Sequence, residues 1–94
     1  MIKEIVNIDR LCDALLTLKT HDECKVFLND ICTIQELEAL NQRLEVAEKL
    51  LQGESYSDIN KSVGASTATI SRVSKYLNYG DGGYKMVIGR MKND

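Results

Sequence analysis

The sequence predicts an all-α protein. Apolar residues recur at spacings of three and four along most of its 94 residues, which is the period of amphipathic helices. Ser or Thr followed three residues later by an acidic residue marks several helix starts. No segment shows the strict alternation of apolar and polar residues that is typical of a half-buried strand. The length corresponds to one small domain.

The spacing of apolar residues within residues 1–32 predicts two helices, each with one apolar face. The first ends near Lys19, and the second begins after Thr20, because Thr20 and Glu23 have the spacing of a capping box. The apolar stripe of the first helix consists of Ile5, Ile8, Cys12 and Leu15. The buried face of the second consists of Cys24, Phe27, Leu28 and Ile31.

The longest predicted helix covers about residues 34–52. Thr33 and Glu36 repeat the capping box at its start, and Gly53 ends it. Its apolar residues form a heptad-like seam of Leu37, Leu40, Leu44, Ala47 and Leu51. Three apolar stripes within residues 1–54 exceed what the small second half can cover. We therefore expect a homodimer; the alternative is a compact monomer with an internal three-helix core.

Two shorter helices follow, at about residues 56–63 and from Ser66 to about Leu77. Ser55 and Asp58 form an acidic variant of the capping pattern, and Gly64 ends the first of these helices. Glycines at 80, 82 and 83 then predict a loop. One or two amphipathic turns end the chain, with an apolar side of Tyr84, Val87, Ile88 and Met91.

The segment from Tyr56 to Tyr79 has the pattern of a DNA-reading helix-turn-helix. This motif needs inward apolar residues on two short helices and a residue between them that can adopt positive φ, here Gly64. The inner faces consist of Ile59 and Val63 on the first helix and Ile70, Val73 and Leu77 on the second. Asn60 departs from the pattern, because many such motifs have alanine at that position.

With this inner face, the second helix presents short polar residues outward. The predicted DNA-binding residues are Ser66, Thr67, Ala68, Ser71, Arg72 and Lys75. Short side chains let a helix backbone approach base edges in the major groove, while Arg and Lys reach guanine or phosphate. The alternative is a solvated surface helix. Ser and Thr are indifferent helix formers, so a purely structural helix would more naturally use Glu, Lys or Ala.

Two stretches of the sequence resemble the tryptophan-repressor superfamily, from Thr33 to about Leu77. "EALNQRLEVAEKLLQGE" is similar to the long central helix of that family and its glycine stop. "GASTATISRVSKYL" is similar to its turn and recognition helix. Within that superfamily the sequence resembles the small tryptophan-repressor-like proteins of Gram-positive bacteria, the YerC/YecD group. The resemblance implies an intertwined all-helical homodimer that presents two helix-turn-helix units to operator DNA, as a repressor.

The resemblance also implies a site for the effector L-tryptophan, held between two arginines that match Arg43 and Arg72. The sequence departs from the tryptophan-binding members at two positions. Val73 stands where those members have glycine, and Tyr76 stands where they have a small serine. A valine side chain would fill space that the indole needs. We therefore expect no cofactor and no tryptophan switch, and Arg43 would instead pair with Glu36 or with a carboxylate of a partner chain.

Charge is distributed unevenly along the chain. The formal net charge is −2, but residues 1–54 have six Lys/Arg and eleven Asp/Glu, a net charge of −5. Residues 55–94 have six Lys/Arg and three Asp, a net charge of +3. A polyanion would bind the second half, although +3 is a weak field. The acidic total keeps a second hypothesis open, in which the helix-turn-helix is a scaffold for protein interaction without specific DNA binding.

Several classes of function are excluded by what the sequence lacks. One histidine, no sheltered carboxylate pair and no phosphate-binding glycine loop argue against an enzyme. Three cysteines without a CxxC spacing argue against a metal site or a disulfide framework, and favour buried free thiols. No apolar run is long enough for a bilayer, and the start does not resemble a signal peptide. We expect a cytoplasmic protein of one domain, with a dimerisation core at 1–54, the helix-turn-helix at 55–79, and a loop and short helix at 80–94.

Overall fold

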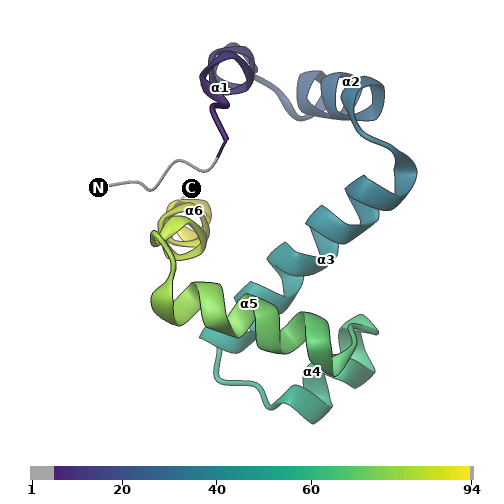
Figure 1. Cartoon of the computed structure of the whole chain (residues 1–94), viewed down its shortest axis with the longest axis vertical. Coiled ribbons are helices and arrows are strands. Elements are labelled where there is room, and N and C mark those ends of the chain that lie inside the picture. The colour runs from purple at the N-terminus through teal and green to yellow at the C-terminus, as the bar shows by residue number, and fades with distance from the viewer. Residues whose placement is uncertain (1–5, 94) are drawn as a thin grey trace. The chain divides into compact units, whose positions relative to one another are not determined.

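The computed structural model describes residues 6–93 and contains only helices in that range. They are α1 (Asp9–Leu15), α2 (His21–Ile31), α3 (Ile34–Leu51), α4 (Tyr56–Val63), α5 (Thr67–Tyr79) and α6 (Gly83–Lys92), as labelled in Figure 1. The all-α prediction is confirmed. By contacts the chain divides into two compact units, one up to Glu38 and one from Ala39 onward. The predicted functional division at residues 54 and 79 concerns assembly and stays a prediction.

The predicted helix caps of the first unit are present. Thr20 Oγ1 accepts a hydrogen bond from the Glu23 N–H at 3.1 Å, at the start of α2. Before α3 the capping box is reciprocal: the Glu36 N–H donates to Thr33 Oγ1 at 3.1 Å, and the Thr33 N–H donates to Glu36 Oε1 at 2.8 Å. These bonds satisfy donors that the first turn of a helix would otherwise leave free.

Helix α1 is shorter than the prediction. Ile5, the first residue of the predicted stripe, lies outside the described residues, and Ile8 directly precedes the helix. The helix ends at Leu15 instead of continuing to about Lys19. The reason is that the Lys19 N–H donates to Glu23 Oε1 at 2.9 Å and so belongs to the cap of α2.

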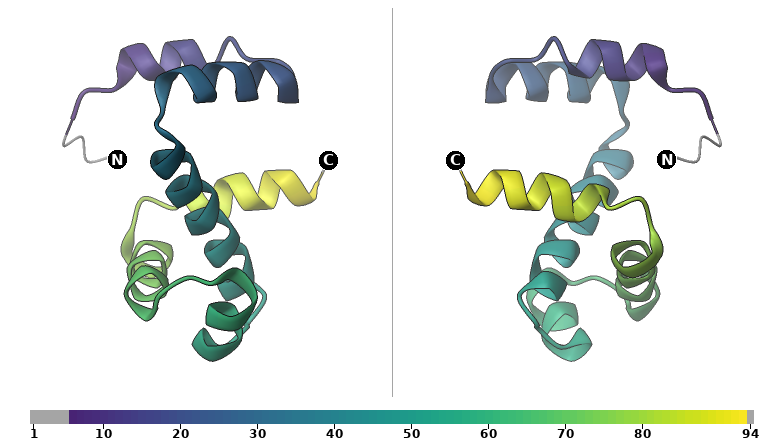
Figure 2. Two further views of the ribbon diagram at one scale, coloured as in Figure 1. Left: turned by 90° about the vertical axis from the view of Figure 1, so that its right-hand side faces the viewer. Right: turned by 90° about the vertical axis from the view of Figure 1, so that its left-hand side faces the viewer.

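The second unit is built around one apolar core. Its buried members are Val46 and Ala47 of α3, Ile59 of α4, Ala65 of the following turn, Ile70, Val73 and Leu77 of α5, and Ile88 of α6. The predicted inner face of the helix-turn-helix is therefore confirmed, with Val63 partly buried at its edge. Figure 2 shows α4 and α5 against the C-terminal part of α3.

The heptad-like seam predicted for α3 is confirmed only in part by the core of the second unit, and packing of its other residues on a partner chain stays a prediction. Ala47 is buried and Leu44 packs against the core, but Leu40 and Leu51 are exposed. Val46 and Leu50 face the core instead. The heptad pattern assumes one partner along the whole helix, whereas this end of α3 contacts two short helices, which shifts the buried face.

The C-terminal segment forms a longer helix than the one or two turns predicted. Helix α6 has ten residues, and Gly83, predicted in the loop, is its first residue. Gly82 precedes it with φ of 86°. Ile88 is 2% exposed and belongs to the core of the second unit, so the tail packs on its own chain.

Two further expectations concern thiols and membranes. All three cysteines are free, but Cys12 is exposed and Cys24 and Cys32 are only half-buried. Within the single chain the thiols are not buried, since neither α1 nor α2 contains a buried residue, and their burial in a homodimer stays a prediction. Among residues 6–93, no helix combines the length and the apolar character needed to span a membrane.

The cap of α5 provides a stability prediction. Ser66→Ala removes the side-chain oxygen that accepts from the Thr69 N–H, and we expect the free energy of unfolding to fall by about 1 kcal/mol. Ser71→Ala is the matched control, because Ser71 is an exposed serine inside the same helix. Urea unfolding measures both. Equal midpoints for the two variants would contradict the assigned cap.

Candidate nucleic-acid interface

Helix α5 has one buried face and one exposed face. Ile70, Val73 and Leu77 anchor it in the core of the second unit. All six residues predicted to bind DNA are exposed, namely Ser66, Thr67, Ala68, Ser71, Arg72 and Lys75. Ala68, Arg72 and Lys75 follow one another at steps of four and three, so they form a single stripe opposite the buried face. The buried and exposed faces of α5 are therefore those that the sequence predicted.

The turn before α5 is tightly held. Gly64 ends α4 with φ of 78°, a left-handed conformation that favours glycine. Ala65 is fully buried, and its place in the core was not predicted from the sequence. Ser66 Oγ accepts from the Thr69 N–H and donates to Thr69 Oγ1, both at 3.1 Å. The Ser66 hydroxyl is therefore engaged within α5, and its contact with DNA stays a prediction.

Asn60, the residue that departs from the usual motif, has a specific role in this turn. Its side-chain Nδ2 donates to the Ala65 carbonyl at 2.7 Å. Its backbone carbonyl accepts from the Gly64 N–H at 2.9 Å. The departure is visible in the sequence, but this side-chain bond was not predicted from it. An asparagine five residues before a turn carbonyl is the only signal that could have indicated it.

The exposed face of α5, called here the reading surface, carries positive charge and no negative charge. No acidic residue occurs between Asp58 and Asp81, whereas Lys61, Arg72 and Lys75 lie in that interval. The ion pair found among residues 6–93 is Lys49–Glu54 at 3.5 Å, so neither Arg72 nor Lys75 is paired with a carboxylate there. Exposed cations without local partners can bind phosphate without first giving up an ion pair.

Arg43 and Arg72, the predicted effector-binding arginines, line the same hollow. It has a volume of about 200 Å³, and its other lining residues are Ala39, Gln42 and Thr69. No acidic residue lines it. Arg43 Nε donates to the Ala39 carbonyl at 3.3 Å, and the expected pairing of Arg43 with Glu36 is not found among the described residues. Gln42 and Thr69 were not predicted as part of this site.

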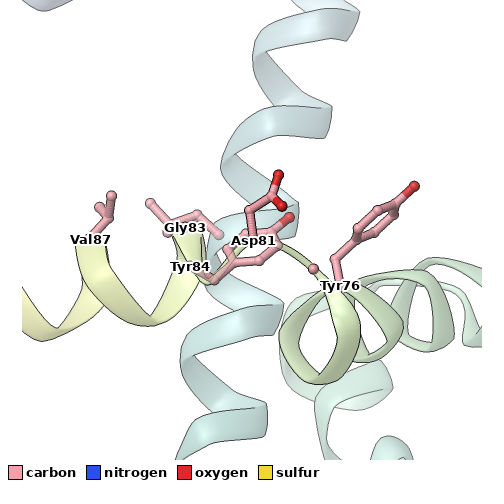
Figure 3. A pocket seen from close by; sticks show the side chains of 7 residues that line it. Tyr76, Asp81, Gly83, Tyr84 and Val87 are labelled. Carbon is pink, nitrogen blue, oxygen red and sulfur yellow. The ribbon is translucent and has the colours of Figure 1, made fainter. Parts of the chain in front are cut away.

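The two residues that argued against tryptophan lie elsewhere in the second unit. Val73 is buried in the core. Tyr76 lines a separate, larger hollow of about 490 Å³, whose other lining residues are Leu44, Gly80, Asp81, Gly83, Tyr84 and Val87. Figure 3 shows Tyr84 between Val87 and Tyr76, which lie on opposite sides of this hollow. Residues 6–93 bring together no group of His, Cys, Asp and Glu suited to a metal ion.

Comparisons with known proteins agree with this geometry. Residues 6–92 match the family model described as Trp repressor protein. The Bacillus subtilis (strain 168) protein YerC is 49% identical over 85 residues, which cover 90% of this chain and 82% of YerC. This match confirms the predicted similarity to the YerC/YecD group.

Two solved structures have the same fold. A protein from Staphylococcus aureus, described as a candidate Trp repressor, superposes with a TM-score of 0.88 at 46% identity, over 93% of this chain and 87% of that one. A TrpR-like protein from Eubacterium eligens ATCC 27750 superposes with a TM-score of 0.87 at 48% identity, over 90% and 88%. The chain therefore belongs to the Trp repressor protein family, a family of DNA-binding regulators.

Proposed function

We propose that this protein is a sequence-specific regulator of transcription, a repressor that binds operator DNA as a homodimer in the cytoplasm and has no catalytic role. The observation that carries the proposal is the exposed face of α5, where short side chains lead and two unpaired cations follow. Short residues allow the start of a helix to enter the major groove, and the cations then reach bases or phosphates.

Each exposed residue has a role that fits its chemistry. Thr67 can donate to a base or a phosphate, and the Ala68 methyl group can contact a thymine methyl group. Arg72 is long enough to bind guanine through two hydrogen bonds. Lys75 lies about one turn further along α5, where the helix leaves the groove, and there it contacts phosphate. Ser71 supplies a further short donor at the groove surface, whereas Ser66 has to break its hydrogen bond to Thr69 Oγ1 before it can donate to DNA.

The homodimer is supported by the apolar surface of the first unit. Helices α1 and α2 contain no buried residue. Large apolar side chains are exposed there: Leu16, directly after α1, is 84% exposed, and Val26 of α2 is 66% exposed. An open hollow of about 440 Å³ in the same unit includes Leu18, Val26 and Phe27 in its lining. Helices of seven and eleven residues are not stable alone and need a surface to pack on. A second copy supplies that surface in a two-fold symmetric pair.

The proposal does not include control by L-tryptophan. Val73, which stands where the tryptophan-binding members have glycine, is 1% exposed and packed in the core, and it does not line the hollow between Arg43 and Arg72. The hollow between Arg43 and Arg72 remains a place where an anionic effector could be held by two guanidinium groups. The competing hypothesis of a protein-interaction module predicts no dependence of function on duplex DNA.

Selection from a random pool of duplexes tests the proposal. The purified full-length protein should enrich a two-fold symmetric site at moderate salt, because two identical reading helices face the DNA. Adding L-tryptophan should leave the enriched sequence and its affinity unchanged. The absence of any enriched sequence, with and without tryptophan, would refute the DNA-reading function and favour the protein-interaction module.

Substitutions on α5 distinguish base reading from phosphate contact. On the selected duplex, Arg72→Ala should weaken binding by about 1–3 kcal/mol and relax the preference at one base position. Lys75→Ala is the matched comparison: it should keep the sequence preference and lower the slope of log affinity against log salt by about 1. Fluorescence anisotropy at several salt concentrations measures both. Unchanged affinity for Arg72→Ala would remove that residue from the interface.

A further inference from the structure

We propose that Asn60 is a positioning residue for DNA reading, which fixes the direction in which α5 leaves the turn. The inference rests on the proposed function, because it concerns how α5 meets DNA. It does not require Asn60 to touch DNA. Asn60 acts through the Ala65 carbonyl, and Ala65 lies three residues before Ala68, the first residue of the exposed stripe.

Asn60 holds two of the three residues that connect the helices. The Gly64 N–H donates to the Asn60 backbone carbonyl at 2.9 Å, which closes the last turn of α4. The Asn60 Nδ2 donates to the Ala65 carbonyl at 2.7 Å, which reaches across the turn. The third residue, Ser66, is held by Thr69 within α5. The bond to Ala65 is therefore the side-chain hydrogen bond that ties the turn back to α4, beyond the backbone bond of Gly64.

Because this bond lies at the start of α5, a small change in it displaces the DNA-binding residues further along the helix. With a rise of about 1.5 Å per residue, Arg72 lies about 9 Å along the helix from Ser66, so a rotation of about 10° at the turn moves it by roughly 1.6 Å. Recognition of base edges through hydrogen bonds needs placement within about 0.5 Å. Phosphate contacts made by a flexible lysine tolerate such a shift, because the side chain can follow the oxygen atom.

The Asn60 side chain orients α5 but contributes little to the stability of the fold. Ala65 is fully buried, but Asn60, which covers its carbonyl, is exposed, so removal of the Asn60 side chain opens that carbonyl to water. The packing of Ile59 against Ile70 and Val73 does not involve the amide. Loss of the hydrogen bond from Asn60 to the Ala65 carbonyl, called here the Asn60 clamp, should therefore leave the fold intact. It should also allow α5 a wider range of directions.

The test compares Asn60→Ala and Asn60→Asp with the control Asn78→Ala. Aspartate has nearly the same shape as asparagine but has no N–H to donate. Asn78 is the matched control, because its Nδ2 also donates to a backbone carbonyl, that of Ser74 at 2.9 Å, but within α5 and away from the turn. The measured quantities are the Kd for the selected duplex, the Kd for an unrelated duplex of equal length, and the thermal midpoint.

Asn60→Ala should lower the ratio of specific to nonspecific affinity about tenfold, the size of one misread base pair, with the nonspecific Kd and the thermal midpoint unchanged. Asn60→Asp should lower the same ratio, while its added negative charge weakens binding to both duplexes. Asn60→Gln, which keeps an amide donor, should recover part of the ratio, and Asn78→Ala should behave as the wild type. An unchanged ratio for Asn60→Ala would overturn the proposal. A parallel loss of both affinities and of thermal stability would also overturn it, since that pattern indicates a purely structural role.

A measurement without DNA keeps this inference distinct from the proposed function. The carbonyl ¹³C resonance of Ala65 should shift in Asn60→Asp and not in Asn78→Ala, because only the first variant removes its hydrogen-bond donor. No shift in Asn60→Asp would show that the clamp is absent. A shift in a protein that selects no DNA sequence would instead refute the proposed function while leaving the clamp in place.

Discussion

The burial of Ile59, Ile70 and Val73 against the C-terminal part of α3 is the interaction on which the rest of the second unit depends. Each of the three side chains is at most 1% exposed. Helices of eight and thirteen residues are too short to persist alone, so α4 and α5 are helical because they share this core. The core also fixes which face of α5 points outward. The reading surface is therefore a consequence of packing.

A second constraint follows from how little of the first unit is buried. Its caps are well made, since Thr20 and Thr33 both accept the expected hydrogen bonds, but caps fix only where helices start. Apolar side chains such as Leu16 and Val26 remain exposed. In the proposed homodimer a second copy covers them, and the same packing sets the distance between two reading helices.

Much of this architecture could be predicted from the sequence, because local chemistry determines it. Capping residues and Gly64 marked the helix ends, and the spacing of Ile70, Val73 and Leu77 gave the phase of α5. The packing of Val46 and Leu50 in the core could not be predicted, since the buried face of α3 depends on which helices pack against it. The Asn60 clamp could not be predicted either, because it joins two residues through a turn whose path the sequence does not specify.

The most direct test of paired DNA reading is the spacing between half-sites. If two copies hold their reading helices in a fixed pair, insertion of five base pairs at the centre of the selected site turns one half-site by about half a helical turn, away from its helix. We predict that affinity then falls to the value for an unrelated duplex of equal length. Affinity that does not change with the insertion would show that each copy binds alone, and would contradict the paired reading surface.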